Sequence, residues 1–111
     1  MLMLPKTPVV RDRKYLDSFR DAKCILTNQY GNEYVSVVGA HIRLGGDAGS
    51  GGTSYKPSDD RVLPLLKHLH DEQGVVGELT FWRDAFAMND RLLIEAIIAL
   101  AEKRYRQWQS R

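Results

Sequence analysis

The chain is poor in cysteine, with Cys24 as its one thiol among 111 residues. A single cysteine excludes an internal disulfide framework and is typical of proteins in a reducing cytoplasm. Long apolar runs are also missing: no segment approaches the roughly 18 residues that a membrane span requires. Pro5 and Lys6 interrupt the apolar run at the start of the sequence, and the run is therefore too short for a secretory signal. We therefore expect a cytoplasmic protein without a membrane segment.

Acidic and basic residues are nearly balanced, at 14 and 16, but they are unevenly distributed. Residues 1–23 carry six Lys or Arg and three acids, residues 24–102 carry six and eleven, and residues 103–111 carry four and none. Basic ends around an acidic middle suit a protein that holds a polyanion with its flanks and keeps carboxylates at a central site. The same ends are equally compatible with a simple gain in solubility.

The length and the 43% hydrophobic content suit one domain, 1–111, with a modest core. Four segments have the periodicity or the end signals of helices, namely 12–22, 64–73, 78–87 and 90–108. Pro64 suits the first turn of the second helix and Gly74 its C-terminal cap. Asn89 or Asp90 suits the N-cap of the last helix. The apolar stripe of that helix is formed by Leu93, Ile97 and Leu100, with Trp108 farther along.

Two β-rich runs, 24–30 and 33–42, flank Gly31-Asn32, which is typical of a hairpin turn. A loop over 44–53 follows and holds five of the nine glycines. The order strand, strand, loop, helix predicts a compact ββα unit with helices on both sides, and hence an α+β fold.

The end of the second run carries groups that suit phosphate chemistry. Side chains alternate along a strand, so His41 and Arg43 are expected on one face. A neutral imidazole can take a proton from water near pH 7, and a guanidinium binds phosphate oxygens with its planar array of N–H groups. The glycines that follow have no Cβ, so a sugar-phosphate backbone could approach closely.

The far end of the glycine-rich loop supplies a cation and two carboxylates. Lys56 precedes Pro57 and is therefore biased toward an extended conformation that could aim its ammonium back across the loop. Asp59 and Asp60 offer hard oxygen ligands that suit Mg²⁺. In the next helix His68 and His70 lie about 200° apart around the axis, so only one can face a site formed with His41. A lone helix histidine is also compatible with a plain surface or core role.

The pattern AHIRLGG…GSGGTSYKPSD…LPLLKHLHDEQ…GE…FW, within residues 24–82, resembles the HNH nucleases of phages and prophages, including the Ref-like recombination-enhancement group. In that family an HIR strand end leads through a glycine-rich GTG-x-KPSD loop to a PLC-x-x-(C/H)H helix, often followed by GE-x-x-FW. The Ala-His-Ile-Arg and Lys-Pro-Ser-Asp segments are specific at this separation, whereas either alone is weak.

The resemblance implies a small ββα-metal (HNH) core over about 24–82, with flanking helices and the long C-terminal helix. It also implies a metal-dependent endonuclease that hydrolyses DNA phosphodiester bonds in a bacterial or host cytoplasm. A divalent ion, Mg²⁺ or Mn²⁺, would be its cofactor, and the basic positions Arg43 and Lys56 would hold substrate phosphate. The Ref-like group adds a recombinase filament as a possible partner, which the sequence leaves open together with the oligomeric state.

The family motif assigns roles by position. His41 matches the general base that activates water, and His70 matches the last histidine of the motif, a ligand of the catalytic ion. Asp59 and Asp60 lie where the middle polar residue is expected as a further metal position, and the pattern does not choose between them. Ala40 and Gly74 stand where many relatives carry further ligands, so substrate phosphate would have to complete the metal shell.

Relatives of this type usually hold a structural zinc ion with two Cys-x-x-Cys pairs. Here the first pair reads CILT, with Thr27 at its second position, and the second reads LKHL, with Leu66 and Leu69. Three of four ligands are absent, and a closed zinc site needs about four N or S ligands. We expect an apolar plug with Cys24 in place of zinc. A ligand set of Cys24, His68 and outside residues is the remaining alternative.

Two other functions are compatible with these features. The first is a non-catalytic DNA-binding accessory module on a decayed HNH scaffold, in which the basic groups bind phosphate without cleavage. The second needs no nucleic acid: the final helix would mediate dimerisation or partner docking, with Trp82 and Trp108 as anchors.

Overall fold

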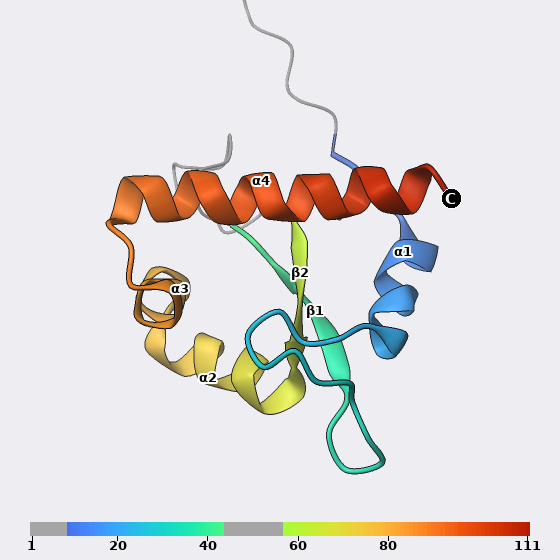
Figure 1. Cartoon of the computed structure of the whole chain (residues 1–111), viewed down its shortest axis with the longest axis horizontal. Coiled ribbons are helices and arrows are strands. Elements are labelled where there is room, and N and C mark those ends of the chain that lie inside the picture. The colour runs from blue at the N-terminus through green and yellow to red at the C-terminus, as the bar shows by residue number, and fades with distance from the viewer. Residues whose placement is uncertain (1–8, 44–56) are drawn as a thin grey trace, which may run out of the picture.

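Residues 9–43 and 57–111, which the computed structural model describes, form four α-helices, one 3-10 helix and two strands. In chain order the elements are α1 (Arg13–Ser18), η1 (Phe19–Asp21), β1 (Val37–His41), β2 (Val62–Leu66), α2 (Lys67–Val76), α3 (Glu78–Phe86) and α4 (Asp90–Gln109). Figure 1 shows α4 lying across one end of the two strands, with α1 on one side of them and α2 and α3 on the other. The predicted α+β class is therefore confirmed.

The sheet is not the predicted hairpin. β1 pairs antiparallel with β2, with His41 opposite Val62, whereas 24–30 was expected to pair with 33–42. All five residues of β2 are buried, while most of 24–30 is exposed or half-buried. Burial of apolar side chains is the main favourable term in folding, so β1 gains more from pairing with β2. The resulting order is strand, loop, strand, helix.

Residues 24–29 instead close a tight loop. The Asn28 N–H donates to the Cys24 carbonyl at 2.8 Å, and the Cys24 N–H donates to the Gln29 carbonyl at 2.8 Å. Asn28 has a φ of 57°, a left-handed conformation that asparagine tolerates better than most residues. Beyond this loop, Lys23 and Tyr30 form an isolated bridge.

The helix predicted over 64–73 begins only at Lys67, because the residues before it belong to β2. Pro64 lies in this strand opposite Gly39, and its carbonyl accepts the N–H of Ile25 at 2.8 Å. The N–H and C=O of a strand residue point to the same side, so the missing N–H of the proline faces away from β1. Proline therefore costs the sheet no hydrogen bond here.

The other helices follow their local signals more closely. The predicted helices 12–22, 78–87 and 90–108 are confirmed as α1 with η1, as α3 and as α4. The predicted cap Gly74 lies inside α2, and Gly77, with a φ of 94°, is the C-cap instead. Asn89 caps α4, accepting the Leu92 N–H at 3.0 Å.

The buried stripe of α4 differs from the prediction at one position. Leu100 is 38% exposed, because the buried face continues in steps of four residues. Its members are Leu93, Ile97, Ala101 and Tyr105. Within the described ranges, no helix combines the length and the hydropathy of a membrane span.

Two apolar clusters join the elements. The larger one surrounds the fully buried Trp82 and connects the sheet to α3 and α4. The smaller one connects α1 and η1 to the start of β2 and the end of α4, through Tyr15, Phe19, Val62 and Tyr105. Full burial of such a side chain contributes about 1.5–3 kcal/mol.

The glycines Gly74 and Gly39 give opposite predictions for substitution by alanine. A Cβ at Gly74 meets nothing within 4 Å, so Gly74→Ala should raise the free energy of unfolding by about 0.5–1 kcal/mol through helix propensity. A Cβ at Gly39 would lie 2.7 Å from Val62 Cγ1 and 3.2 Å from Phe19 Cδ2, and such overpacking costs about 1–3 kcal/mol. Thermal unfolding followed by circular dichroism measures both. Equal melting temperatures for the two variants would contradict the described packing of β1.

Candidate functional site

The end of β1 directs His41 and Arg43 away from the core. Ala40 and Ile42 are buried in the larger cluster, and the residues that alternate with them are half-buried or exposed. Because side chains alternate along a strand, the burial of Ala40 and Ile42 places His41 and Arg43 together on the opposite face. Both side chains line the same cleft, as the alternation predicts.

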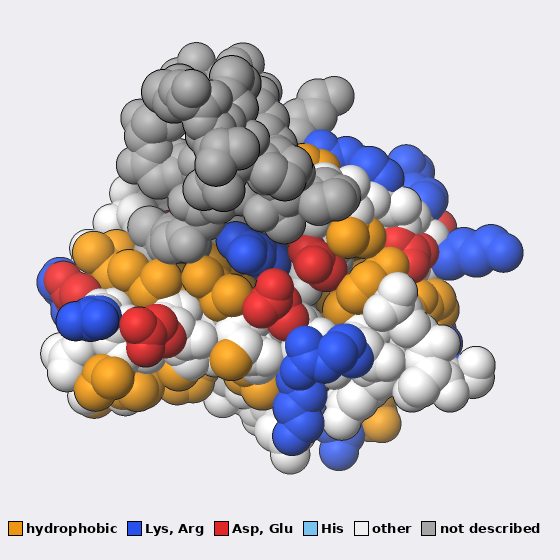
Figure 2. Space-filling model, turned by 90° about the horizontal axis from the view of Figure 1, so that it is seen from above, with side chains coloured by type: hydrophobic (Ala, Val, Ile, Leu, Met, Phe, Trp, Pro, Cys, Tyr) orange, Lys and Arg blue, Asp and Glu red, His pale blue; other side chains and the backbone are white. Residues whose placement is uncertain are grey.

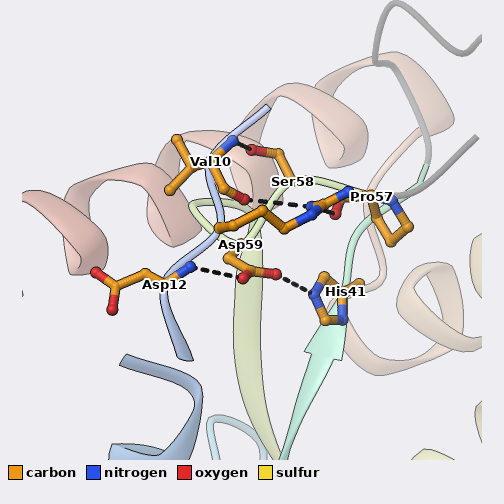
Figure 3. Close-up of polar contacts among 7 residues, drawn as sticks. Val10, Asp12, His41, Pro57, Ser58 and Asp59 are labelled. Atoms are coloured by element: carbon orange, nitrogen blue, oxygen red, sulfur yellow. Dashed lines mark hydrogen bonds and ion pairs between the residues drawn. The ribbon is translucent and has the colours of Figure 1, made fainter. Parts of the chain in front are cut away.

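Asp59 holds the ring of His41. Its Oδ1 lies 2.9 Å from His41 Nε2, and its Oδ2 accepts the backbone N–H of Asp12 at 2.8 Å (Figure 3). The side chain of Asp59 is only 8% exposed, and that of His41 is 27% exposed. A carboxylate buried to this degree requires hydrogen-bond donors, and Asp59 has one on each oxygen.

The segment before α1 is what fixes Asp59 in place. The Asp59 N–H donates to the Val10 carbonyl at 2.9 Å, and the Val10 N–H donates to Ser58 Oγ at 2.9 Å. Arg11 adds a bond from Nη1 to the Pro57 carbonyl at 2.7 Å. Figure 3 shows Val10 bonded to Ser58 and Asp12 bonded to Asp59. Hydrogen bonds therefore join the segment before α1 to the segment that leads into β2.

The bond to Asp59 selects one form of the His41 ring. An ionised carboxylate only accepts hydrogen bonds, so the bond places a proton on Nε2 and leaves Nδ1 of the neutral ring with a free lone pair. In Figure 3 the second ring nitrogen lies on the side away from Asp59. A histidine held in this way can accept a proton at a defined position.

His41 opens onto a cleft of about 340 Å³ between the end of β1 and the helices α2 and α3. The residues that line it are His41, Arg43, His70, Gln73, Gly74, Gly77 and Glu78. Of the two histidines of α2, His70 lines the same cleft as His41, whereas His68 is exposed and lies outside the lining. This arrangement follows the helical geometry expected from their spacing.

The remaining predicted site residues have different surroundings. Asp59 contacts His41 but does not line the cleft, and neither does Asp60. The pKa of Tyr105 is raised to about 12, first by burial and then by its hydrogen bond to Asp12. The negative charge of Asp60 is one of the nearby carboxylate charges that raise this pKa further. Lys56 and the glycine-rich loop over 44–53 lie outside the described residues.

Two residues of the site carried no predicted role. Glu78 lines the cleft, and its Oε1 accepts the Arg43 N–H at 2.8 Å. Asp12 supplies the N–H that holds Asp59, caps α1 through Tyr15, and accepts the Tyr105 hydroxyl at 2.9 Å. Glu78 belongs to the GE segment of the family-like pattern, but no sequence signal connects Asp12 to Asp59, which is 47 positions away.

The cleft offers few protein ligands for a divalent ion. Among residues 9–43 and 57–111, no three His, Cys, Asp or Glu side chains gather as a metal-binding group. Mg²⁺ commonly takes only one or two protein ligands and completes its shell with water and substrate phosphate. Besides His41, the cleft lining offers the imidazole of His70 and the carboxylate of Glu78, so an ion held there would need substrate phosphate and water to complete its shell.

Three of the four positions at which the family pattern has zinc ligands lie together in an apolar environment. Cys24 and Leu66 are buried in the larger cluster, and Leu69 packs against it. The Thr27 hydroxyl and the backbone N–H groups of Thr27, Leu66 and Leu26 lie around the thiol of Cys24 and favour its thiolate. Burial raises the pKa of Cys24, but these groups outweigh it and lower the pKa. The packing agrees with the predicted apolar plug, and the absence of zinc stays a prediction.

Comparison of the chain with protein-family models, with curated proteins and with solved structures gave no significant match. The function is therefore argued from the residues and their geometry.

The apolar plug predicts that a zinc site can be rebuilt. The variant Thr27→Cys, Leu66→Cys, Leu69→Cys adds three thiols to Cys24 and should bind one zinc ion per chain, with a clear rise in melting temperature on zinc addition. Without metal, the loss of the buried Leu66 should cost no more than the roughly 2–5 kcal/mol of a buried Leu→Ala change, and the loss of the half-buried Leu69 should cost less. Elemental analysis of protein prepared without chelator measures the metal. Stoichiometric zinc on Cys24 in the unmodified chain would contradict the prediction.

Proposed function

We propose that this chain is a metal-dependent endonuclease that hydrolyses phosphodiester bonds of DNA. The observation that supports it best is the placement of His41 and His70 on one cleft, with the carboxylate of Asp59 holding His41 from behind. A base of defined tautomer, a second imidazole and a guanidinium at one cleft are the groups that such a hydrolysis uses.

In this proposal His41 takes the proton of a water molecule at Nδ1 while the water oxygen attacks phosphorus. The bond between phosphorus and the 3′ oxygen breaks, and that oxygen leaves with the electron pair and is protonated by solvent. Asp59 stabilises the imidazolium that forms, because its carboxylate already accepts from Nε2. Arg43 lines the cleft and would bind a phosphate oxygen.

His70 would hold the divalent ion, with the carboxylate of Glu78 as the second protein donor of the cleft. When bound, such an ion contributes electrostatic stabilisation to the charge that develops on phosphate and on the leaving oxygen. Asp59 and Asp60 remain the residues that the family motif suggests for the middle position. Asp59 is the one in contact with His41.

The endonuclease proposal predicts nicking of supercoiled plasmid in the presence of Mg²⁺ or Mn²⁺. His41→Ala should lower the rate about 10²–10⁴-fold, the usual contribution of a general base. His70→Ala should lower it as well, and high metal concentration should restore part of the loss. His68→Ala is the matched control, because His68 lies on the same helix outside the cleft, and it should cleave at the unmodified rate.

The role of Asp59 makes a separate prediction. Asp59→Asn keeps the shape of the side chain, but its amide can present a donor to Nε2 and stabilise the wrong tautomer. The cleavage rate should fall between about 10- and 10⁴-fold, while circular dichroism and DNA affinity stay unchanged. Cleavage at the full rate by Asp59→Asn would remove Asp59 from the proposed machinery.

A non-catalytic DNA-binding module is the second candidate. It is favoured by Arg43, which lines the cleft and can bind a phosphate oxygen without any cleavage step. The same assays separate the two: salt-dependent DNA binding without cleavage under any divalent ion would support this module and overturn the endonuclease.

A further inference from the structure

The two basic ends of the chain meet in the fold. The helix α1 packs against the last turns of α4 through Tyr15, Tyr105 and Trp108, and Figure 1 shows α1 beside the C-terminal end of α4. The segments 9–23 and 103–111 together carry nine Lys or Arg and three acids. Figure 2 shows several of the Lys and Arg side chains projecting on the side of the molecule where α4 ends.

A pocket of about 440 Å³ opens at this junction, lined by residues of α1, η1 and the end of α4. The His41 cleft shares no lining residue with it. Its lining residues are Tyr15, Ser18, Asp21, Ala22, Arg104, Gln107, Trp108 and Arg111. The lining contains two guanidinium groups and one carboxylate, so its formal charge is positive.

The guanidinium groups of Arg104 and Arg111 lie over aromatic rings, and no carboxylate of the described residues forms an ion pair with them. Arg111 Cζ lies 3.9 Å from the ring centre of Trp108, and Arg104 Cζ lies 5.4 Å from that of Phe19. Neither arginine forms an ion pair with a carboxylate of residues 9–43 or 57–111. A guanidinium stacked on an aromatic ring keeps the N–H groups of its edge available, and these match the oxygens of a phosphate.

The pocket wall also contains an unused donor. The hydroxyl of Tyr15 is buried beside the Arg104 guanidinium, and its O–H donates to no acceptor among the described residues. Burial raises the pKa of Tyr15 to about 12, although the Arg104 charge opposes this, so the phenol stays protonated and neutral. A neutral donor beside two cations favours an anion that carries oxygen acceptors.

We propose that the pocket between α1 and the end of α4 binds a backbone phosphate of DNA, away from the His41 cleft. The inference rests on the proposed function for the identity of the polyanion. Its chemistry does not require cleavage: Arg104 and Arg111 hold one phosphodiester and so fix how the duplex lies across the protein. The basic residues at the two ends of the chain would then position the DNA through one shared contact.

The test is DNA binding measured by fluorescence anisotropy with a labelled duplex in EDTA, over a series of salt concentrations. The variant Arg104→Gln, Arg111→Gln should reduce the magnitude of the salt slope by about 0.9, the value for one lost phosphate contact, and should weaken binding at least about 10-fold at 0.1 M salt. The matched control is Arg83→Gln, Arg91→Gln, which removes two arginines that are ion-paired to Asp90 and Glu95. The control should keep the slope within about 0.5 of the unmodified value.

A slope for Arg104→Gln, Arg111→Gln equal to that of the control would overturn the inference. Arg111→Gln alone provides the test should the double variant fail to fold, because Arg111 lies beyond the end of α4, and it should reduce the slope by up to about 0.9. Tyr15→Phe should weaken binding several-fold with an unchanged slope.

Cleavage assays keep this inference separate from the proposed function. His41→Ala should bind DNA with the unmodified slope while losing cleavage. Binding that depends on Arg104 and Arg111 without cleavage under any divalent ion would overturn the endonuclease and leave the phosphate pocket standing. Cleavage together with a salt slope that is unchanged in Arg104→Gln, Arg111→Gln would support the endonuclease and overturn the phosphate pocket.

Discussion

The pairing of β1 with β2 is the constraint on which the site depends. β2 is buried along its whole length and leads directly into α2, so its position is set by the apolar core. Once β1 pairs with it, His41 lies opposite Val62 and close to Asp59, which precedes β2 by only a few residues. The same pairing brings α2 beside the end of β1, and His70 thereby reaches the cleft that His41 lines.

The polar part of the site depends on burial of a carboxylate. Asp59 is nearly inaccessible, and its two oxygens are satisfied by His41 and by the N–H of Asp12. Removal of either donor would leave a buried charge with too few hydrogen bonds, which is costly. Asp12 is in turn held by Tyr105 of α4. The orientation of His41 therefore depends on segments from both ends of the chain.

Aromatic packing between α1 and α4 gives the basic ends a common location. Tyr15 packs against Tyr105 and Trp108 with ring centres 4.8 and 5.6 Å apart, and this contact places Arg104 and Arg111 beside the first helix. Charges of one sign gathered at a single surface raise the local potential more than the same charges at separate places. A weakly charged chain can in this way present one strongly basic surface.

Local signals in the sequence determined α1, α3 and α4 and the start of α4, where Asn89 is the N-cap. Both ends of α2 differ from the predicted ones, because the residues before Lys67 belong to β2 and Gly77 is the C-cap. Alternation along the strand likewise placed His41 and Arg43 on one face. The partner of β1, the bond between His41 and Asp59, and the contact between Asp59 and Asp12 were decided only by the tertiary structure. The reason is that helix caps and periodicity involve residues a few positions apart, whereas strand pairing and burial of a carboxylate depend on which distant segments exclude water together.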